Sequence, residues 1–387
     1  MKHILLLNNI AGAGLDRLPT DGYVCGTDEK NPDAILVRSA VMHDMAFGEN
    51  LLAVARAGAG VNNIPIDRLT AAGIPVFNTP GANAGGVKEL TVCALLLASR
   101  KIYDGIAWAN ALEKSENLPK EVEKGKAKFA GVELCGKKLG VIGLGAIGGQ
   151  VANAAVALGM KVIGCDPFLS VDAAWNIDGH VEKAATFDEV FAAADYITLH
   201  VPATDETRGM ICRESIAKMK DGVRIVNLSR ADLVVAEDIK EALAGGKVAA
   251  YVTDFPTAET VGVPGIVTIP HLGASTEEAE ENCAVMAADE LTDYLENGNI
   301  KNSVNFPNTS MPKSGERRIC LLHANVPAVL SKITGILSAL GVNIENMVNK
   351  SKGKNAYTVL DVTGDVPAEA VRALSEIEGM YRVRTLS

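Results

Sequence analysis

Short apolar runs alternate with amphipathic segments along most of the chain. The N-terminal part holds three apolar runs of strand length, at 3–8, 34–39 and 74–79. From position 137 the alternation is regular, with strand-length runs at 137–143, 161–166, 194–202, 222–229 and 247–254. Apolar strands separated by helices are typical of parallel sheets. The pattern therefore predicts an α/β fold.

A single long amphipathic segment follows at 275–299 and predicts a helix. Ser275 followed by Glu278 fits a capping box, and Gly298 fits the C-terminal stop. The next stretch, 301–318, is polar, rich in Pro, Asn and Ser, and lacks periodicity. We interpret it as a linker.

The pattern restarts after this stretch with four strand-like and two helix-like segments. Their order is strand 317–324, helix 326–341, strand 342–351, strand 355–363, helix 367–379 and strand 381–386. This is βαββαβ, the ferredoxin-like order, in a length that can form a domain of its own.

Composition limits the partners and the compartment. A net charge of −10 disfavours nucleic acid and anionic membrane surfaces as partners. The seven cysteines are scattered without a C-x-x-C pair, so we expect neither a metal site nor a disulfide framework. The first apolar run is broken by Asn8 and Asn9, and no run approaches membrane-spanning length. We expect a cytoplasmic protein.

The stretch "LGVIGLGAIGGQ" contains a G-x-G-x-x-G motif, from Gly143 through Gly145 to Gly148. The motif follows an apolar strand and opens a helix, where glycines allow a tight turn and close approach of a pyrophosphate. The next strand ends at Asp166. An acid there accepts a hydrogen bond from a ribose 2′-hydroxyl and repels a 2′-phosphate, so NAD is favoured over NADP.

Three later strands end in residues suited to the oxidation of a 2-hydroxy acid: Arg230, Asp254 and His271. In open α/β sheets the site lies at the carboxyl ends of the strands. A guanidinium can hold a carboxylate, and a histidine can take a hydroxyl proton while hydride leaves the same carbon. A carboxylate can orient the imidazole.

With these motifs the chain resembles the D-isomer-specific 2-hydroxyacid dehydrogenases. The matching stretches include "GVIGLGAIG", "CDPF", "LHVPATDETRGMI", "VNLSRADLV" and "IPHLGASTEEA". Upstream, "LVRSAV", "RAGAGVNNIPID" and "NTPGANAGGVKEL" fit the family's substrate-domain motifs. The resemblance covers nearly the whole chain, with its motifs in the family's order.

The resemblance implies two Rossmann-like parallel-sheet domains and a C-terminal ferredoxin-like domain similar to ACT domains. The expected substrate domain is discontinuous, 1–96 and 276–306, around an NAD-binding domain at 97–275. A linker at 307–316 and an ACT domain at 317–387 follow. A homo-oligomer is also expected.

The resemblance also implies residue roles. Arg230 holds the substrate carboxylate and His271 is the acid/base. The cofactor contacts are Gly143, Gly145, Ala146, Ile147, Gly148, Asp166, Pro202 and Asp254, with Asp254 facing the nicotinamide carboxamide. The substrate contacts are Arg38, Ser39, Gly60 and Asn83. Arg38 and Ser39 end an apolar strand, where they can hold a phosphate. Arg56 is expected to be a surface side chain.

The carboxylate that orients His271 is open between two residues. The family pattern has Glu-Pro after Asp-Val-Phe, whereas this chain has "VTDFPTAET". Glu259 is the only glutamate between Asp254 and His271 and is the first candidate. Asp254 is the alternative.

In the tail, the resemblance implies that His323, Asn325 and Asn343 bind L-serine as an effector. Ala328 stands where the family often has glycine. The expected activity is NAD-dependent oxidation of D-3-phosphoglycerate to 3-phosphohydroxypyruvate, in serine biosynthesis. Two alternatives remain: a hydroxypyruvate or glyoxylate reductase on the same fold, and a non-catalytic NAD-binding regulator.

Overall fold

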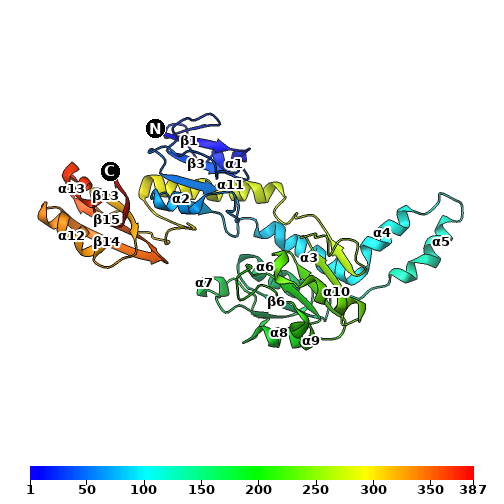
Figure 1. The fold of residues 1–387 in the computed structure, drawn as a ribbon. Coiled ribbons are helices and arrows are strands. Elements are labelled where there is room, and N and C mark those ends of the chain that lie inside the picture. Colours follow the sequence, from blue (N-terminus) through cyan, green and yellow to red (C-terminus); the bar gives the residue numbers. More distant parts are fainter. The chain divides into compact units, whose positions relative to one another are not determined.

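A computed structural model describes all 387 residues, which divide into two compact units. Unit 1 comprises Met1–Ala82 and Glu280–Ser387, and unit 2 comprises Asn83–Ala279. The predicted α/β class is confirmed: there are two parallel sheets and one antiparallel sheet (Figure 1). None of the helices has the length and apolar character needed to cross a bilayer.

The parallel sheet of unit 1 has five strands in the order β2-β1-β3-β4-β5. The strands are β1 (Lys2–Leu7), β2 (Tyr23–Gly26), β3 (Ala34–Val37), β4 (Ala53–Arg56) and β5 (Val76–Asn78). The helices of this part are α1 (Gly12–Leu15), α2 (Ile66–Ala71) and the long α11 (Glu277–Asn297), which belongs to unit 1 from Glu280 onward. α11 packs its alanines against the sheet, and a side chain at Gly14 of α1 would lie 2.6 Å from Ala284.

The predicted long helix exists, but its cap lies one residue later than expected. The Thr276 hydroxyl accepts a hydrogen bond from the Ala279 backbone N–H at 3.1 Å, so Thr276 takes the place predicted for Ser275. At the other end Gly298 has a φ of +71°, the left-handed conformation of a helix stop.

The sheet of unit 2 has seven parallel strands in the order β12-β11-β10-β9-β6-β7-β8. They are β6 (Lys138–Ile142), β7 (Lys161–Cys165), β8 (Val181–Lys183), β9 (Tyr196–Leu199), β10 (Val223–Asn227), β11 (Val248–Thr253) and β12 (Ile266–Thr268). The strand order changes direction at β6, between β7 and β9. This is the switch point where doubly wound sheets bind their ligands.

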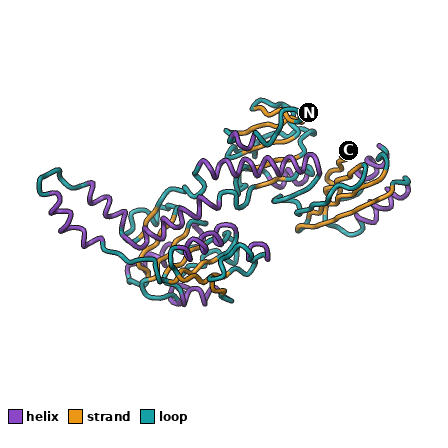
Figure 2. The backbone as a smooth tube through the Cα atoms, turned by 180° about the vertical axis from the view of Figure 1, so that it is seen from behind, coloured by secondary structure: helices purple, strands orange, loops and turns teal.

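The helices of unit 2 cover this sheet and extend beyond it. They are α3 (Ala84–Arg100), α4 (Ile102–Asn110), α5 (Leu118–Gly125), α6 (Ala146–Ala157), α7 (Val171–Ala174), α8 (Phe187–Ala193), α9 (Arg213–Lys218) and α10 (Ala236–Ala244), with short 3-10 turns at Lys126–Phe129 and Ala231–Leu233. α3 buries Ala94, Leu95 and Ala98 against this sheet, so the division falls before Asn83 rather than at the expected residue 96. α4 and α5 form a hairpin that projects from the unit (Figure 2).

Residues 317–386 form a four-stranded antiparallel sheet with two helices, here named the C-terminal sheet domain. The strand order is β14-β15-β13-β16. The elements are β13 (Arg317–Ala324), α12 (Val329–Ala339), β14 (Asn343–Lys352), β15 (Asn355–Thr363), α13 (Ala368–Ser375) and β16 (Met380–Leu386). The predicted ferredoxin-like order is therefore present.

The C-terminal sheet domain is packed onto α11 through a shared core. Cys320, Leu322, Tyr357 and Val359 belong to the same apolar cluster as Leu291 of α11. Three side chains also donate hydrogen bonds to the last carbonyls of the helix: Arg384 to Tyr294 (3.2 Å) and Leu295 (2.9 Å), Arg318 to Asn297 (2.6 Å) and Tyr357 to Gly298 (2.6 Å). Side chains from β13, β15 and β16 thus bond the carbonyls around the end of α11, where the hydrogen bonds within the helix run out.

The segment between α11 and β13 has no helix or named strand, yet parts of it are buried. Phe306 and Met311 lie in the apolar cluster with α11, and the Asn305 side chain bonds the backbone of Val76 and Ile74. Residues 300–311 are therefore anchored in unit 1. Because this stretch is polar overall, its composition did not reveal that Phe306 and Met311 are buried.

Candidate active site and dinucleotide-binding loop

The loop between β6 and α6 has the backbone that a pyrophosphate site requires. Gly143 has a φ of +87°, and a Cβ there would lie 2.5 Å from the His200 carbonyl oxygen. A Cβ at Gly148 would lie 1.9 Å from the Gly143 carbonyl oxygen. At Gly145 a Cβ would meet nothing within 4 Å, so the loop is open on that side. Only glycine fits at positions 143 and 148, and Gly145 leaves room for a ligand.

The N-terminus of α6 is free of competing groups. Its first turn has no acidic side chain, and no side chain caps it. Ala146 and Ile147 therefore present helix N–H groups that can bind a phosphate. Beneath the loop, burial lowers the pKa of His200 to about 4, so this imidazole is neutral. Sequence reasoning assigned no role to His200, although it lies in the quoted stretch "LHVPATDETRGMI".

Asp166 ties the two loops of this region together. Its Oδ2 accepts from the Leu144 N–H at 2.9 Å, and its Oδ1 accepts from the Phe168 N–H at 2.9 Å. Each carboxylate oxygen can accept a further hydrogen bond. An acid at the end of β7 with spare acceptor capacity fits a ribose hydroxyl, so the residues of this loop fit NAD.

Arg230, Asp254 and His271 follow three neighbouring strands, β10, β11 and β12. Asn227 holds the backbone that carries Arg230, donating to the Arg230 carbonyl at 2.8 Å. The Arg230 side chain is exposed and makes no ion pair; its guanidinium bonds only the Ser229 carbonyl, at 2.6 Å. The His271 ring is exposed and packs on Phe255, with ring centroids 4.8 Å apart.

Asp254 is the electrostatic centre of this group. The residue is 1% exposed, and neither carboxylate oxygen has a hydrogen-bond partner. Burial raises the pKa of Asp254, and the charges of His271 and Arg230 oppose that rise. A buried carboxylate without donors is costly. Its two free acceptors match an imidazole N–H or the amide group of nicotinamide.

Glu259 lies elsewhere in the same unit. Its exposed side chain lies within a tight turn, in which the Thr260 N–H bonds the Thr257 carbonyl at 3.1 Å. It lines a hollow of about 240 Å³ together with Asp232 and Tyr251. No hydrogen bond joins Glu259 to His271. The charge of His271 acts on Asp254, where it opposes the rise in pKa that burial causes.

In unit 1, Arg38 and Ser39 lie at the carboxyl end of β3. The Arg38 guanidinium is ion-paired with Glu280. The side chain of Asn8, which has a left-handed φ of +77°, accepts from the backbone N–H groups of Ser39 (2.9 Å) and Ala40 (2.7 Å). This turn is therefore fixed by a residue from the end of β1.

Arg56 differs from the surface side chain we expected. It is only partly exposed, burial lowers its pKa, and its Nε donates to the Arg38 carbonyl at 2.9 Å. The guanidinium fits because Gly58 has no side chain: a Cβ there would lie 2.8 Å from Arg56 Nη1, and one at Gly60 would lie 3.5 Å away. The two glycines following the arginine were the available signal.

The remaining predicted contacts have these positions. Asn83 precedes α3 without a side-chain capping bond, and the carbonyl of the exposed Pro202 accepts from Thr207 Oγ1 at 2.5 Å. In the C-terminal sheet domain His323 is 3% exposed, and its two ring nitrogens bond Ala324 O and Thr358 Oγ1, each at 2.8 Å. Asn325 bonds Gly353 O at 3.2 Å, and Asn343 bonds Glu345 at 2.8 Å.

Comparison with known proteins identifies the family. Residues 93–273 match the family model described as "D-isomer specific 2-hydroxyacid dehydrogenase, NAD binding domain". The chain is 32% identical over 354 residues to D-3-phosphoglycerate dehydrogenase of Escherichia coli, covering 87% of this chain and 82% of that protein. It is 38% identical over 285 residues to the Archaeoglobus fulgidus protein of the same name, covering 71% of this chain but 52% of the relative. The chain thus spans about half the length of that archaeal relative.

Among solved structures, the NAD⁺-bound 3-phosphoglycerate dehydrogenase of Entamoeba histolytica has a TM-score of 0.58 and 25% identity. The match covers 79% of this chain and 98% of that one. The match of residues 93–273 makes unit 2 the NAD-binding part, in agreement with the loop geometry. The chain belongs to the D-isomer-specific 2-hydroxyacid dehydrogenase family.

Proposed function

We propose that the chain oxidises D-3-phosphoglycerate at C2 to 3-phosphohydroxypyruvate with NAD, a reaction of serine biosynthesis. The observation that carries the proposal is the group Arg230, Asp254 and His271 at the ends of three adjacent strands, with an unpaired guanidinium and an unpaired buried carboxylate. The names of the relatives described above support the substrate.

Each side chain of the group has a role that its environment supports. The unpaired Arg230 guanidinium binds the substrate carboxylate through a fork of N–H donors. His271 accepts the proton of the C2 hydroxyl as the C–H bond breaks. NAD, when bound, supplies the hydride acceptor. The Phe255 ring packs against the His271 imidazole in a tilted arrangement.

Asp254 takes the role of orienting carboxylate in this proposal, in place of Glu259. A negative charge beside His271 stabilises the imidazolium that forms when the proton is transferred. Burial raises the pKa of Asp254 and the charge of His271 opposes that rise, which supports this pairing. The free acceptors of Asp254 also suit the carboxamide contact expected from the family, and one carboxylate has lone pairs for both donors.

The substrate phosphate is assigned to Arg38 and Arg56. The two side chains lie close together: burial lowers the pKa of Arg56, and the charge of Arg38 lowers it further. A divalent anion would relieve that repulsion and would compete with Glu280 for Arg38. This pair supports a phosphorylated 2-hydroxy acid over a substrate that lacks the phosphate.

Steady-state turnover tests the substrate and the roles together. We expect turnover with 3-phosphoglycerate and NAD, and far lower kcat/KM with glyoxylate or hydroxypyruvate and NADH. Turnover of the unphosphorylated acids alone would assign the reductase function. Tight NADH binding without turnover of any of these acids would assign the regulator.

The His271→Ala variant should lower kcat by about 10²–10⁴-fold, the usual size of a general acid–base contribution, with NADH affinity unchanged. His180→Ala is the matched control, because His180 is exposed in the same unit and pairs only with Asp178. Asp254→Asn should lower kcat and alter the pH profile, whereas Glu259→Gln should leave both unchanged. The reverse result would restore Glu259 as the orienting carboxylate.

We further infer that the C-terminal sheet domain is an ACT domain that binds L-serine through Asn325 and Asn343. The βαββαβ order and the exposed amide of Asn343 support this. The buried His323, whose ring nitrogens are both engaged, is better suited to holding β13 against β15. Serine titration of activity in wild type, Asn343→Ala and the control Asn308→Ala tests the site. Light scattering, with and without serine, tests the expected homo-oligomer.

A further inference from the structure

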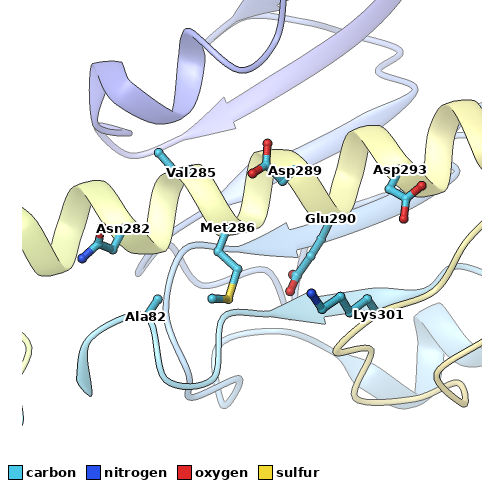
Figure 3. Close-up of a pocket in the computed structure, with 8 residues that line it drawn as sticks. All are labelled: Ala82, Asn282, Val285, Met286, Asp289, Glu290, Asp293 and Lys301. Carbon is cyan, nitrogen blue, oxygen red and sulfur yellow. The ribbon is translucent and has the colours of Figure 1, made fainter. Parts of the chain in front are cut away.

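A hollow in unit 1 lies along α11, away from the groups described above. Its volume is about 560 Å³, and it is walled by α11 and by the segment that follows the helix. The polar and flexible side chains around it are Asn282, Met286, Asp289, Glu290, Asp293 and Lys301. Figure 3 shows Glu290 extending from α11 toward Lys301 and Met286 extending from the same side of the helix, whereas the Asp289 carboxylate lies on the opposite edge of the helix.

Glu290 is buried in the wall of this hollow with one carboxylate oxygen unpaired. It is 5% exposed; its Oε1 accepts a hydrogen bond from Asn302 Nδ2 at 2.6 Å, but its Oε2 has no partner. Burial raises the pKa of Glu290 to about 7, although Asn302 and Lys301 act in the opposite direction. A buried carboxylate oxygen without a donor destabilises a fold unless something supplies the donor.

The other charged side chains of the hollow differ in whether they have an ion-pair or hydrogen-bond partner. Asp289 is paired with Arg17 at 2.7 Å, and Asp293 accepts from Asn297 (2.9 Å) and Asn299 (3.0 Å). Lys301 is exposed and has no carboxylate within 4.0 Å. The hollow therefore offers one unpaired acidic group and one unpaired basic group, which do not pair with each other.

The carboxylates do not form a metal site. No group of three or more His, Cys, Asp or Glu side chains in the chain is arranged to hold a metal ion. The opposed directions of Asp289 and Glu290 in Figure 3 account for this at the hollow. The complementary ligand is an organic molecule with an ammonium group and a carboxylate.

We propose that this hollow binds a small zwitterionic amino acid, with Glu290 receiving its ammonium group, Lys301 its carboxylate and Met286 its side chain. An ammonium supplies the donor that Glu290 Oε2 lacks, and charge-assisted hydrogen bonds are the strong ones. The site is separate from Asn325 and Asn343, and it stands whether or not the dehydrogenase proposal holds.

Three matched probes test the charge requirement by calorimetry on the full chain: L-norvaline, n-butylamine, which lacks its carboxylate, and pentanoate, which lacks its ammonium. We expect L-norvaline to bind with a Kd of about 1 mM or below. The two half-probes should bind at least 10-fold more weakly. Equal binding of butylamine and norvaline would refute the requirement for a zwitterion. Absence of binding by all three probes would refute the site.

Glu290→Gln and Lys301→Met should each weaken norvaline binding at least 10-fold. Glu281→Gln, which changes an exposed glutamate on the same helix, is the matched control and should change it less than 2-fold. Circular dichroism checks that the variants fold. We expect Glu290→Gln to fold, because it removes a buried charge. Unchanged affinity in both folded variants would refute the assignment.

Proton release gives a second readout. The charged groups around Glu290 are Lys301 from the following segment and, on α11 itself, Asp293 and the oppositely directed Asp289, which is paired with Arg17. A bound ammonium favours the ionised carboxylate, so norvaline binding at pH 7 should release a fraction of a proton. Calorimetry in two buffers of different ionisation enthalpy measures it. Release that persists in Glu290→Gln would show that another group titrates and would overturn the role of Glu290.

Discussion

The ion pair between Arg318 and Asp361 is the most deeply buried one in the chain, and replacing Asp361 by Asn tests its contribution. Both side chains are 0% exposed. Arg318 Nε and Nη2 donate to the two carboxylate oxygens at 2.7 and 3.0 Å, and Ser314 donates to the same carboxylate through its N–H and its hydroxyl. The remaining guanidinium nitrogen bonds the Asn297 carbonyl at the end of α11.

The expected cost of Asp361→Asn follows from that geometry. Asparagine keeps one acceptor but turns an amide N–H₂ toward the guanidinium, so one charge-assisted bond is lost and Arg318 is left buried without a counter-charge. Removing one partner of a buried ion pair costs about 3–5 kcal/mol. We expect a loss of this size in the free energy of unfolding of the C-terminal sheet domain.

Urea unfolding followed by pulse proteolysis measures this loss. The double variant Arg318→Met with Asp361→Leu should recover most of it, because apolar replacement of a buried ion pair is often neutral or stabilising. A cost below about 1 kcal/mol for Asp361→Asn, or a double variant as unstable as the sum of the single ones, would refute the reasoning.

The contribution of the Arg318–Asp361 ion pair to the free energy of unfolding depends on pH with a definite sign. Burial alone would raise the pKa of Asp361, but the hydrogen bonds from Arg318 and Ser314 hold it below the ordinary value of 3.8. The contribution is therefore present above that value and is lost as the pH falls through the lowered pKa. The difference between wild type and Asp361→Asn should be constant near neutral pH and should shrink only below about pH 4.

Four further predictions follow from single positions. Gly148→Ala should weaken NADH binding at least 10-fold in a fluorescence titration, because its Cβ would overlap Gly143 O at 1.9 Å; unchanged affinity would contradict the loop geometry. Asp166→Asn should reduce the preference for NAD over NADP about 10-fold, as measured by kcat/KM for each. Ala328→Gly should raise the stability by up to about 1 kcal/mol in thermal unfolding, since Ala328 has a left-handed φ of +66°; a lower Tm would argue against strain there. Glu290 has a pKa of about 7 in the fold against 4.5 when unfolded, so its stabilisation is lost as the pH rises through 7; Glu290→Gln should therefore be more stable than wild type by about 3 kcal/mol at pH 8 and equal at pH 4.

Much of unit 2 was predictable because its signals are local. The apolar run before Gly143, the glycines themselves and the acid at position 166 follow one another closely in the sequence, and the backbone conformation at Gly143 is what the motif requires. The position of Ala328 was predictable for the same reason. Ala328, which stands where the family often has glycine, has a left-handed φ of +66°, the conformation that glycine adopts most readily.

The sequence left the carboxylate beside His271 open between Glu259 and Asp254, because the position of Glu259 depends on a turn. Residues 257–260 close a tight turn that directs Glu259 into a different hollow, and nothing in the order of "TDFPTAET" reveals its direction. The burial of Arg56 depends on the space above Gly58, which the sequence shows only as a small residue. The α4–α5 hairpin was missed because no residue of either helix is buried: α4 exposes apolar side chains such as Tyr103 and Ile106, and α5 is largely polar.

The capping of α11 by Arg318, Tyr357 and Arg384 has a consequence for synthesis on the ribosome. These donors come from β13, β15 and β16, so the end of the helix cannot be completed until β16 has left the exit tunnel. Unit 2 is continuous and can fold as soon as it emerges, whereas Met1–Ala82 must wait for partners that begin only at Glu280. Until then β5 is an edge strand without its late partner Ser303, a state in which we expect chaperones to be needed.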